Sequence, residues 1–245
     1  MKPTTYGQPW DAILVPRGPP EGDQEGRMRR TIAFVASATL LFALIHSVLA
    51  TDWMKNRVDV LFGPRVRNGL YRFAYNNITY ASILAMVLAF RRLPDRVVYR
   101  VPRPWSLAMR LGQLIGLWLI ADTNLRMGVG RFTGLSGAWE FISGGLPQRE
   151  PPAQGPRLDS DVERATGGAF RVSRHPNNLG PTLIVCLQPT MGVRLLTFAV
   201  VGGVYSFLGS ILEERRVRAA YQQSYAAYRE RTPFFFPLPI GWREK

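Results

Sequence analysis

The sequence predicts an all-α, polytopic integral membrane protein with about five transmembrane helices, of which the last two form a carboxy-terminal helical hairpin. Four long runs contain no charged residue, and the arginines crowd into the gaps between them. No stretch alternates between polar and apolar residues for long enough to suggest a β-barrel. Hydrophobic residues make up 47% of the 245-residue chain, which is too many for a disordered protein.

The predicted helices follow these uncharged runs. Each run approaches the roughly 20 residues that an α-helix needs to cross a bilayer. Core helices of a soluble protein are the alternative, but four such runs would leave too little polar sequence to cover them. A further candidate is interrupted by Arg110 near its start and Asp122 near its end. The five predicted spans are Thr31–Thr51, Phe73–Phe90, Trp105–Leu125, Asn177–Val193 and Leu195–Leu212.

The chain has a net charge of +14, and its basic residues lie mainly between the uncharged runs. Basic residues that bind nucleic acid form a patch on one face, whereas here they lie at the ends of the predicted spans, so we expect a lipid bilayer and no nucleic acid as the partner. With five alternating spans, one side carries 19 basic residues and the other carries nine. The positive-inside rule then places the carboxy terminus in the cytoplasm and the amino terminus outside.

Four regions follow from these spans. Residues 1–30 are a polar tail, and the run after it exceeds the roughly 7–15 apolar residues of a cleaved signal. Residues 31–125 form a three-helix membrane region. Residues 126–173 are rich in Gly and Pro, which predicts a cytoplasmic loop. Residues 174–239 form the hairpin and tail, with a tight turn at Pro189–Arg194.

The stretch "VSRHPNNLG" opens the predicted hairpin. Pro176 suits the first turn of a helix, so Arg174 and His175 stand just ahead of a helix amino terminus. Unpaired N–H groups and a partial positive charge at that end favour an anionic group such as a carboxylate. The other end of the hairpin supplies two adjacent glutamates, Glu213 and Glu214.

A set of tyrosines continues beyond the glutamates. On an unbroken helix Glu214, Tyr221, Tyr225 and Tyr228 share one face, whereas Glu213 points about 100° away. This periodicity favours Glu214 over Glu213 as the functional carboxylate. An interfacial arginine, an aromatic belt and a salt bridge from Glu214 to Arg218 are the structural alternatives.

The order of these elements resembles the isoprenylcysteine carboxyl methyltransferase and phospholipid methyltransferase superfamily. The resemblance covers roughly residues 168–239: Arg-His-Pro, a glycine shortly after, Glu-Glu at the end of the next long helix, spaced tyrosines and a final proline. The stretches "ALIHSVLATDWMK" and "GLYRFAYNNITYAS" are similar to the NnrU-like branch, which includes bacterial methanethiol S-methyltransferases.

This resemblance implies methyl transfer from S-adenosylmethionine to a lipophilic or small thiol acceptor, in a bacterial inner membrane with the active site facing the cytoplasm. Asn177 and Asn178 depart from the superfamily pattern, in which a tyrosine or an aliphatic residue is common. Mapped onto this chain, the implied catalytic residues are Glu214, Glu213 and Arg174, and the implied cofactor-binding residues are Arg174, His175, Pro176, Gly180, Glu214, Tyr221 and Tyr225.

A haem protein is the alternative, because some NnrU-like relatives are haem-dependent isomerases. The chain has only two histidines, His46 and His175, and counting places His46 near the cytoplasmic end of the first span, where both could act as axial ligands. The single cysteine, Cys186, excludes an intramolecular disulfide and a multi-thiolate metal site, and we expect no metal ion.

Overall fold

The computed structural model describes residues 21–150, 155–156, 158 and 165–236. Residues 1–20 of the predicted tail, most of residues 151–164 and the last residues of the predicted tail region, 237–239, lie outside the described residues. The elements, in chain order, are α1 (Glu21–Ala50), α2 (Asp52–Gly69), α3 (Tyr71–Arg91), β1 (Val97–Arg100), α4 (Trp105–Met127), α5 (Val129–Thr133), α6 (Leu135–Ile142), α8 (Ala169–Val172), α9 (Pro176–Cys186), β2 (Thr190–Gly192) and α10 (Val193–Arg231).

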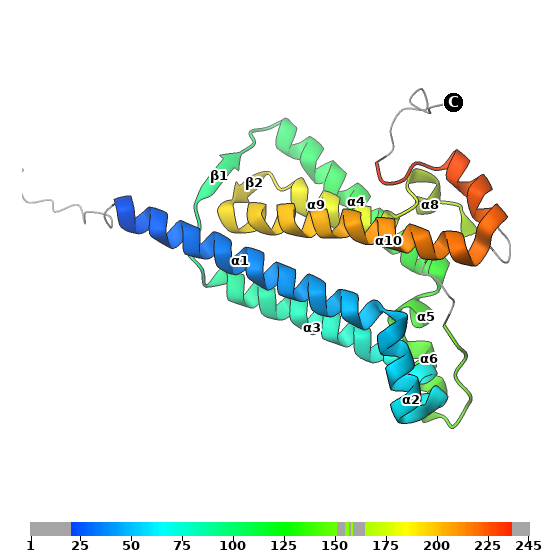
Figure 1. Ribbon diagram of the computed structural model, residues 1–245. Helices are drawn as coiled ribbons and strands as arrows, with labels where there is room; N and C mark the ends of the chain where they lie inside the picture. Colours follow the sequence, from blue (N-terminus) through cyan, green and yellow to red (C-terminus); the bar gives the residue numbers. More distant parts are fainter. Residues whose placement is uncertain (1–20, 151–154, 157, 159–164, 237–245) are drawn as a thin grey trace, which may run out of the picture.

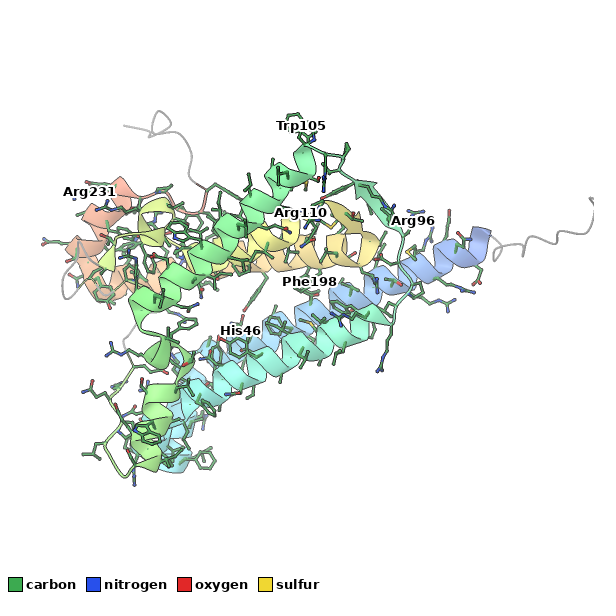
Figure 2. The ribbon with its side chains drawn as sticks, turned by 180° about the vertical axis from the view of Figure 1, so that it is seen from behind. His46, Arg96, Trp105, Arg110, Phe198 and Arg231 are labelled. Atoms are coloured by element: carbon green, nitrogen blue, oxygen red, sulfur yellow. The ribbon has the colours of Figure 1, made fainter. Side chains whose placement is uncertain are left out.

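The long helices form two groups. Helices α1 and α3 lie side by side, α4, α9 and α10 form the second group, and α1 also packs against α10 (Figure 1). The β1–β2 ribbon lies at one end of the molecule, and α2, α5 and α6 lie at the other. Figure 2 shows Trp105, at the start of α4, and Arg231, at the end of α10, at opposite ends of the second group.

Three of the described helices, α1, α3 and α10, are long and apolar enough to cross a membrane. Their large side chains point outward: Leu44 on α1 is 61% exposed, and Leu84 on α3 is 58% exposed. Such surfaces need an apolar solvent, so this mostly helical chain is a membrane protein. Helix α4 has a similar length but carries Arg110, Asp122 and Arg126, and it is not one of the three.

The fourth predicted span does not form a single membrane-crossing helix. Helix α9 ends at Cys186 after 11 residues, about 17 Å, which is too short to cross a bilayer. The chain then becomes extended, and β2 pairs antiparallel with β1. The tight turn predicted at Pro189–Arg194 is therefore wrong: Thr190–Gly192 is a strand, and α10 begins at Val193. The two strands are far apart in the sequence, so the residues around Thr190–Gly192 carry no local pattern that predicts this pairing.

Helices α4 and α9 approach each other through two glycines. A Cβ atom on Gly180 would lie 2.6 Å from the carbonyl oxygen of Gly116, and a Cβ on Gly116 would lie 2.7 Å from the carbonyl oxygen of Gly180. Only glycine permits this backbone contact. It fixes α9 against α4 and thereby fixes the position of the residues that precede α9.

Two further segments differ from the prediction. Residues 126–173, predicted as a loop, contain the short helices α5, α6 and α8. The predicted unbroken helix through the tyrosines is wrong, because Gln222 (φ 37°, ψ −105°) breaks α10. Figure 1 shows the resulting bend near the end of α10.

Candidate active site

The residues ahead of α9 are joined to the carboxy-terminal segment. Ser173 is fully buried; its hydroxyl accepts from the backbone N–H of His175 at 3.1 Å and donates to the carbonyl of Phe234 at 3.3 Å. The backbone N–H of Arg174 donates to the carbonyl of Pro233 at 3.0 Å. Pro176 begins the helix, as its lack of an N–H allows. The chain beyond α10 therefore covers the start of α9.

Arg174 and Glu214 form a largely buried ion pair. Nη2 of Arg174 donates to Oε1 of Glu214 at 3.0 Å, and the two side chains are only 10% and 12% exposed. Nη1 donates to the carbonyl of Thr232 at 2.7 Å, and the guanidinium lies 5.5 Å from the ring centre of Phe234. Through these bonds the Arg174 guanidinium links Glu214 on α10 to the segment that follows α10.

His175 is buried between the two glutamates. Its Nδ1 lies 3.5 Å from Oε2 of Glu213, its Nε2 lies 3.9 Å from Oε2 of Glu214, and its ring meets that of Phe234 edge-on. Burial alone would lower the pKa of His175, but the interactions with Glu213 and then Glu214 outweigh it, so the pKa of His175 is raised. The sequence analysis expected His175 and Glu213 to lie close together, although they are 38 positions apart in the chain.

A cavity of about 370 Å³ separates this cluster from α1 and α3. Of the predicted site residues, Arg174, His175, Pro176 and Glu213 line it. Apolar side chains from four helices form another part of the wall, and polar side chains of α1 and α3 such as His46 and Tyr75 complete the lining; the apolar ones include Phe42, Ile83, Ile120, Met127 and Phe132. One cavity thus joins a charged wall to an apolar wall.

The charged wall presents polar atoms that have no partner within the described residues. They are Nε of Arg174, Nε2 of His175 and Oδ1 of Asn124, each on a residue that lines the cavity. Buried polar atoms in native proteins are nearly always hydrogen-bonded, so these three point to a polar ligand. The Nε–H of Arg174 is a donor, Oδ1 of Asn124 is an acceptor, and Nε2 of His175 can be either, so together they can hold the amino and carboxylate groups of an amino acid.

The other predicted site residues lie away from the cavity. Gly180 packs on Gly116 of α4, and Glu214 faces Arg174. Tyr225 is 2% exposed and belongs to a buried cluster with Phe170, against which Tyr221 also packs. The preference for Glu214 over Glu213 relied on an unbroken helix, and in the structure Glu213 is the one of the two that lines the cavity.

A larger hollow of about 730 Å³ adjoins the cavity and shares Met127 with it. It lies among the ends of α2 and α4 and helices α5 and α6, and its wall includes Arg131 and Arg149. Arg72 in this wall binds Glu150 through two bonds of 2.8 and 3.2 Å. None of the predicted site residues lines this hollow.

Two curated proteins of Bradyrhizobium diazoefficiens are similar to this chain over most of its length. Methanethiol S-methyltransferase 1 is 28% identical over 83% of the chain, and methanethiol S-methyltransferase 2 is 26% identical over 80% of it. The chain is therefore distantly similar to two methanethiol S-methyltransferases. It spans 64% and 70% of the lengths of these two relatives. No profile of a known protein family and no solved structure matches the chain.

Sequence reasoning missed the polar group on the α1–α3 wall of the cavity. Nε2 of His46 bonds the hydroxyl of Tyr75 at 2.6 Å, and Nδ1 bonds the hydroxyl of Thr79 at 3.1 Å. Because both ring nitrogens are engaged, this arrangement gives no support to His46 as an axial haem ligand. Polar residues inside uncharged runs were the available signal, since intramembrane polar groups commonly mark functional sites.

Proposed function

We propose that this protein is an S-adenosylmethionine-dependent integral membrane methyltransferase that methylates a small thiol, with methanethiol as the first candidate. The proposal rests on the cavity that joins the Arg174–His175–Glu213 wall to an apolar wall, and it agrees with the activity in the names of its relatives. The haem protein has no comparable support.

The charged wall fits the amino-acid end of the cofactor. The unpartnered Nε of Arg174 and the amino end of α9 would hold its carboxylate. Glu213, whose side chain is 29% exposed, would hold its ammonium group or lie beside its positive sulfur. When bound, the cofactor supplies a methyl group on a sulfonium, which needs alignment and exclusion of water more than acid catalysis.

The apolar wall fits a small acceptor. Phe42, Ile83 and Phe132 offer no charged group, so a methylthiol-sized molecule can lie there without losing hydrogen bonds. Phe42 and Ile83 of this wall belong to α1 and α3, two of the helices long and apolar enough to cross a membrane. A volatile or membrane-dissolved thiol can therefore reach it from the bilayer. We further propose that the site faces the cytoplasm of a bacterial inner membrane, because the end of the molecule formed by α2, α5 and α6 carries several basic residues, among them Arg57, Arg65 and Arg131.

Methyl transfer to defined acceptors tests this function. The purified protein in detergent is supplied with cofactor carrying a deuterated methyl group and with methanethiol, a larger alkanethiol, an isoprenylated cysteine, a quinol or an amino-lipid. We expect labelled dimethyl sulfide from methanethiol, detected by headspace mass spectrometry, and little product from the oxygen and nitrogen acceptors. Label in the lipid or quinol but in none of the thiols would contradict thiol methylation.

A further inference from the structure

The wall opposite the charged cluster carries a hydrogen-bond chain of fixed direction. The hydroxyl of Thr79 donates its single hydrogen to the carbonyl of Tyr75 at 2.9 Å. It can therefore only accept from Nδ1 of His46, 3.1 Å away. This places the proton of a neutral imidazole on Nδ1 and leaves the lone pair on Nε2. The hydroxyl of Tyr75 is then the donor in its 2.6 Å bond to Nε2.

This chain ends at the cavity. His46, Tyr75 and Thr79 all line it, and Figure 2 shows His46 on the α1–α3 pair. The Tyr75 oxygen gives its hydrogen to His46 and keeps lone pairs for a further donor. Such a tyrosine can accept a proton from a ligand while its own proton moves to the imidazole.

We infer that Tyr75 and His46 remove the proton from the acceptor thiol, a step that a carboxylate acceptor would not need. This inference rests on the proposed function and deepens it. A cysteine thiol is only a few per cent ionised at pH 7 and a simple alkanethiol is ionised less, so a thiol gains from a base, whereas a carboxylate is already an anion at that pH and needs none. A base on the wall that would receive the acceptor is consistent only with an acceptor that has a proton to lose.

The proton transfer balances as follows. The S–H bond breaks, its proton passes to the Tyr75 oxygen, and the Tyr75 proton passes to Nε2 of His46, which becomes an imidazolium. The sulfur keeps the electron pair and uses it for the new bond to the methyl group, while the pair of the broken C–S bond stays on the cofactor's sulfur. After product release the proton returns through Tyr75 to water.

Other ionisable groups surround this pair and belong to its titration. They come from α2, α3, α10 and the segments between helices, and they are Lys55, Tyr71, Arg72, Tyr80, Glu150, Arg174, His175, Tyr205 and Glu213. A pH profile of the wild type alone therefore would not identify the base, and the test needs variants.

Removing one hydroxyl tests the inference. Tyr75→Phe keeps the ring and should lower methyl transfer to methanethiol at pH 7 by about 100-fold or more, the usual contribution of a general base. The deficit should shrink as the pH rises and should be smaller for thiophenol, which ionises more readily than an alkanethiol. Cofactor affinity measured by calorimetry should stay within about twofold of the wild type. His46→Gln should show the same pattern.

Tyr205→Phe is the matched control. It removes a hydroxyl that bonds Ser47 at 3.0 Å, close to His46 but outside the cavity lining, and it should lower methyl transfer far less than Tyr75→Phe does. Equal transfer by the wild type and Tyr75→Phe, at every pH and with both thiols, would overturn the inference while leaving the proposed function in place. A wild type that methylates no thiol would overturn the proposed function itself.

Discussion

The two adjacent glutamates should respond differently to loss of charge. Glu214 lies in the buried pair with Arg174, at 3.0 Å, and a glutamine there keeps one acceptor but leaves the arginine without a counter-charge. A hydrogen bond to a charged group contributes about 1.5–3 kcal/mol. At about 2–4 °C per kcal/mol for a chain of this size, Glu214→Gln should lower the melting temperature by about 3–12 °C.

Glu213→Gln should show the opposite pattern. Glu213 is more exposed and only 3.5 Å from His175, so its loss should lower the melting temperature by less than about 4 °C. If its carboxylate holds the positively charged part of the cofactor, the loss of about 1.5–3 kcal/mol lowers kcat/KM about 10- to 150-fold.

Both variants, with the exposed Glu230→Gln on the same helix as a control, can be compared by thermal unfolding in detergent and by methyl transfer per folded molecule. An active Glu213→Gln together with an inactive Glu214→Gln of normal stability would refute these roles.

Three further predictions address the site, the packing and the topology. Because the pKa of His175 is raised above 6.5, its contribution to stability is complete below about pH 6.5 and is lost as the pH rises through the folded-state pKa, so the melting temperature should fall over that range and should fall less in His175→Gln. Gly180→Ala should destabilise by about 1–3 kcal/mol in thermal unfolding, because its Cβ would meet the carbonyl of Gly116 at 2.6 Å, whereas the loss is absent if α4 and α9 can separate. With Cys186 replaced by serine, a membrane-impermeant thiol reagent added to intact cells should label Arg100→Cys and not Arg215→Cys, and the reverse would contradict the proposed orientation.

Local sequence patterns predicted the apolar helices well, because long uncharged runs such as Phe73–Phe90 have no stable alternative to a helix in lipid. They failed where tertiary contacts decide the backbone. Thr190–Gly192 became extended through pairing with a strand some 90 residues earlier, and α10 bends at Gln222, a residue type that gives no sign of a break.

The site shows the same division. The motif placed Arg174 and His175 beside the glutamates because the start of α9 and the end of the uncharged run within α10 can be located from the sequence alone. Which glutamate lines the cavity depends on rotation about α10, and the direction of the His46–Tyr75 bond depends on Thr79, a contact between two separate helices. Neither can be derived from spacing along the chain.

Binding of S-adenosylmethionine tests the central claim most directly. Calorimetry on the purified full chain should show binding at one site per chain, and His175→Ala, in a folded sample of matched monodispersity, should weaken it by about 10- to 150-fold, as expected for the loss of a hydrogen bond to a charged group worth about 1.5–3 kcal/mol. Equal affinity in the wild type and in folded His175→Ala would contradict the assignment of this cluster as the cofactor site. No binding to the wild type at all would contradict the proposed methyltransferase.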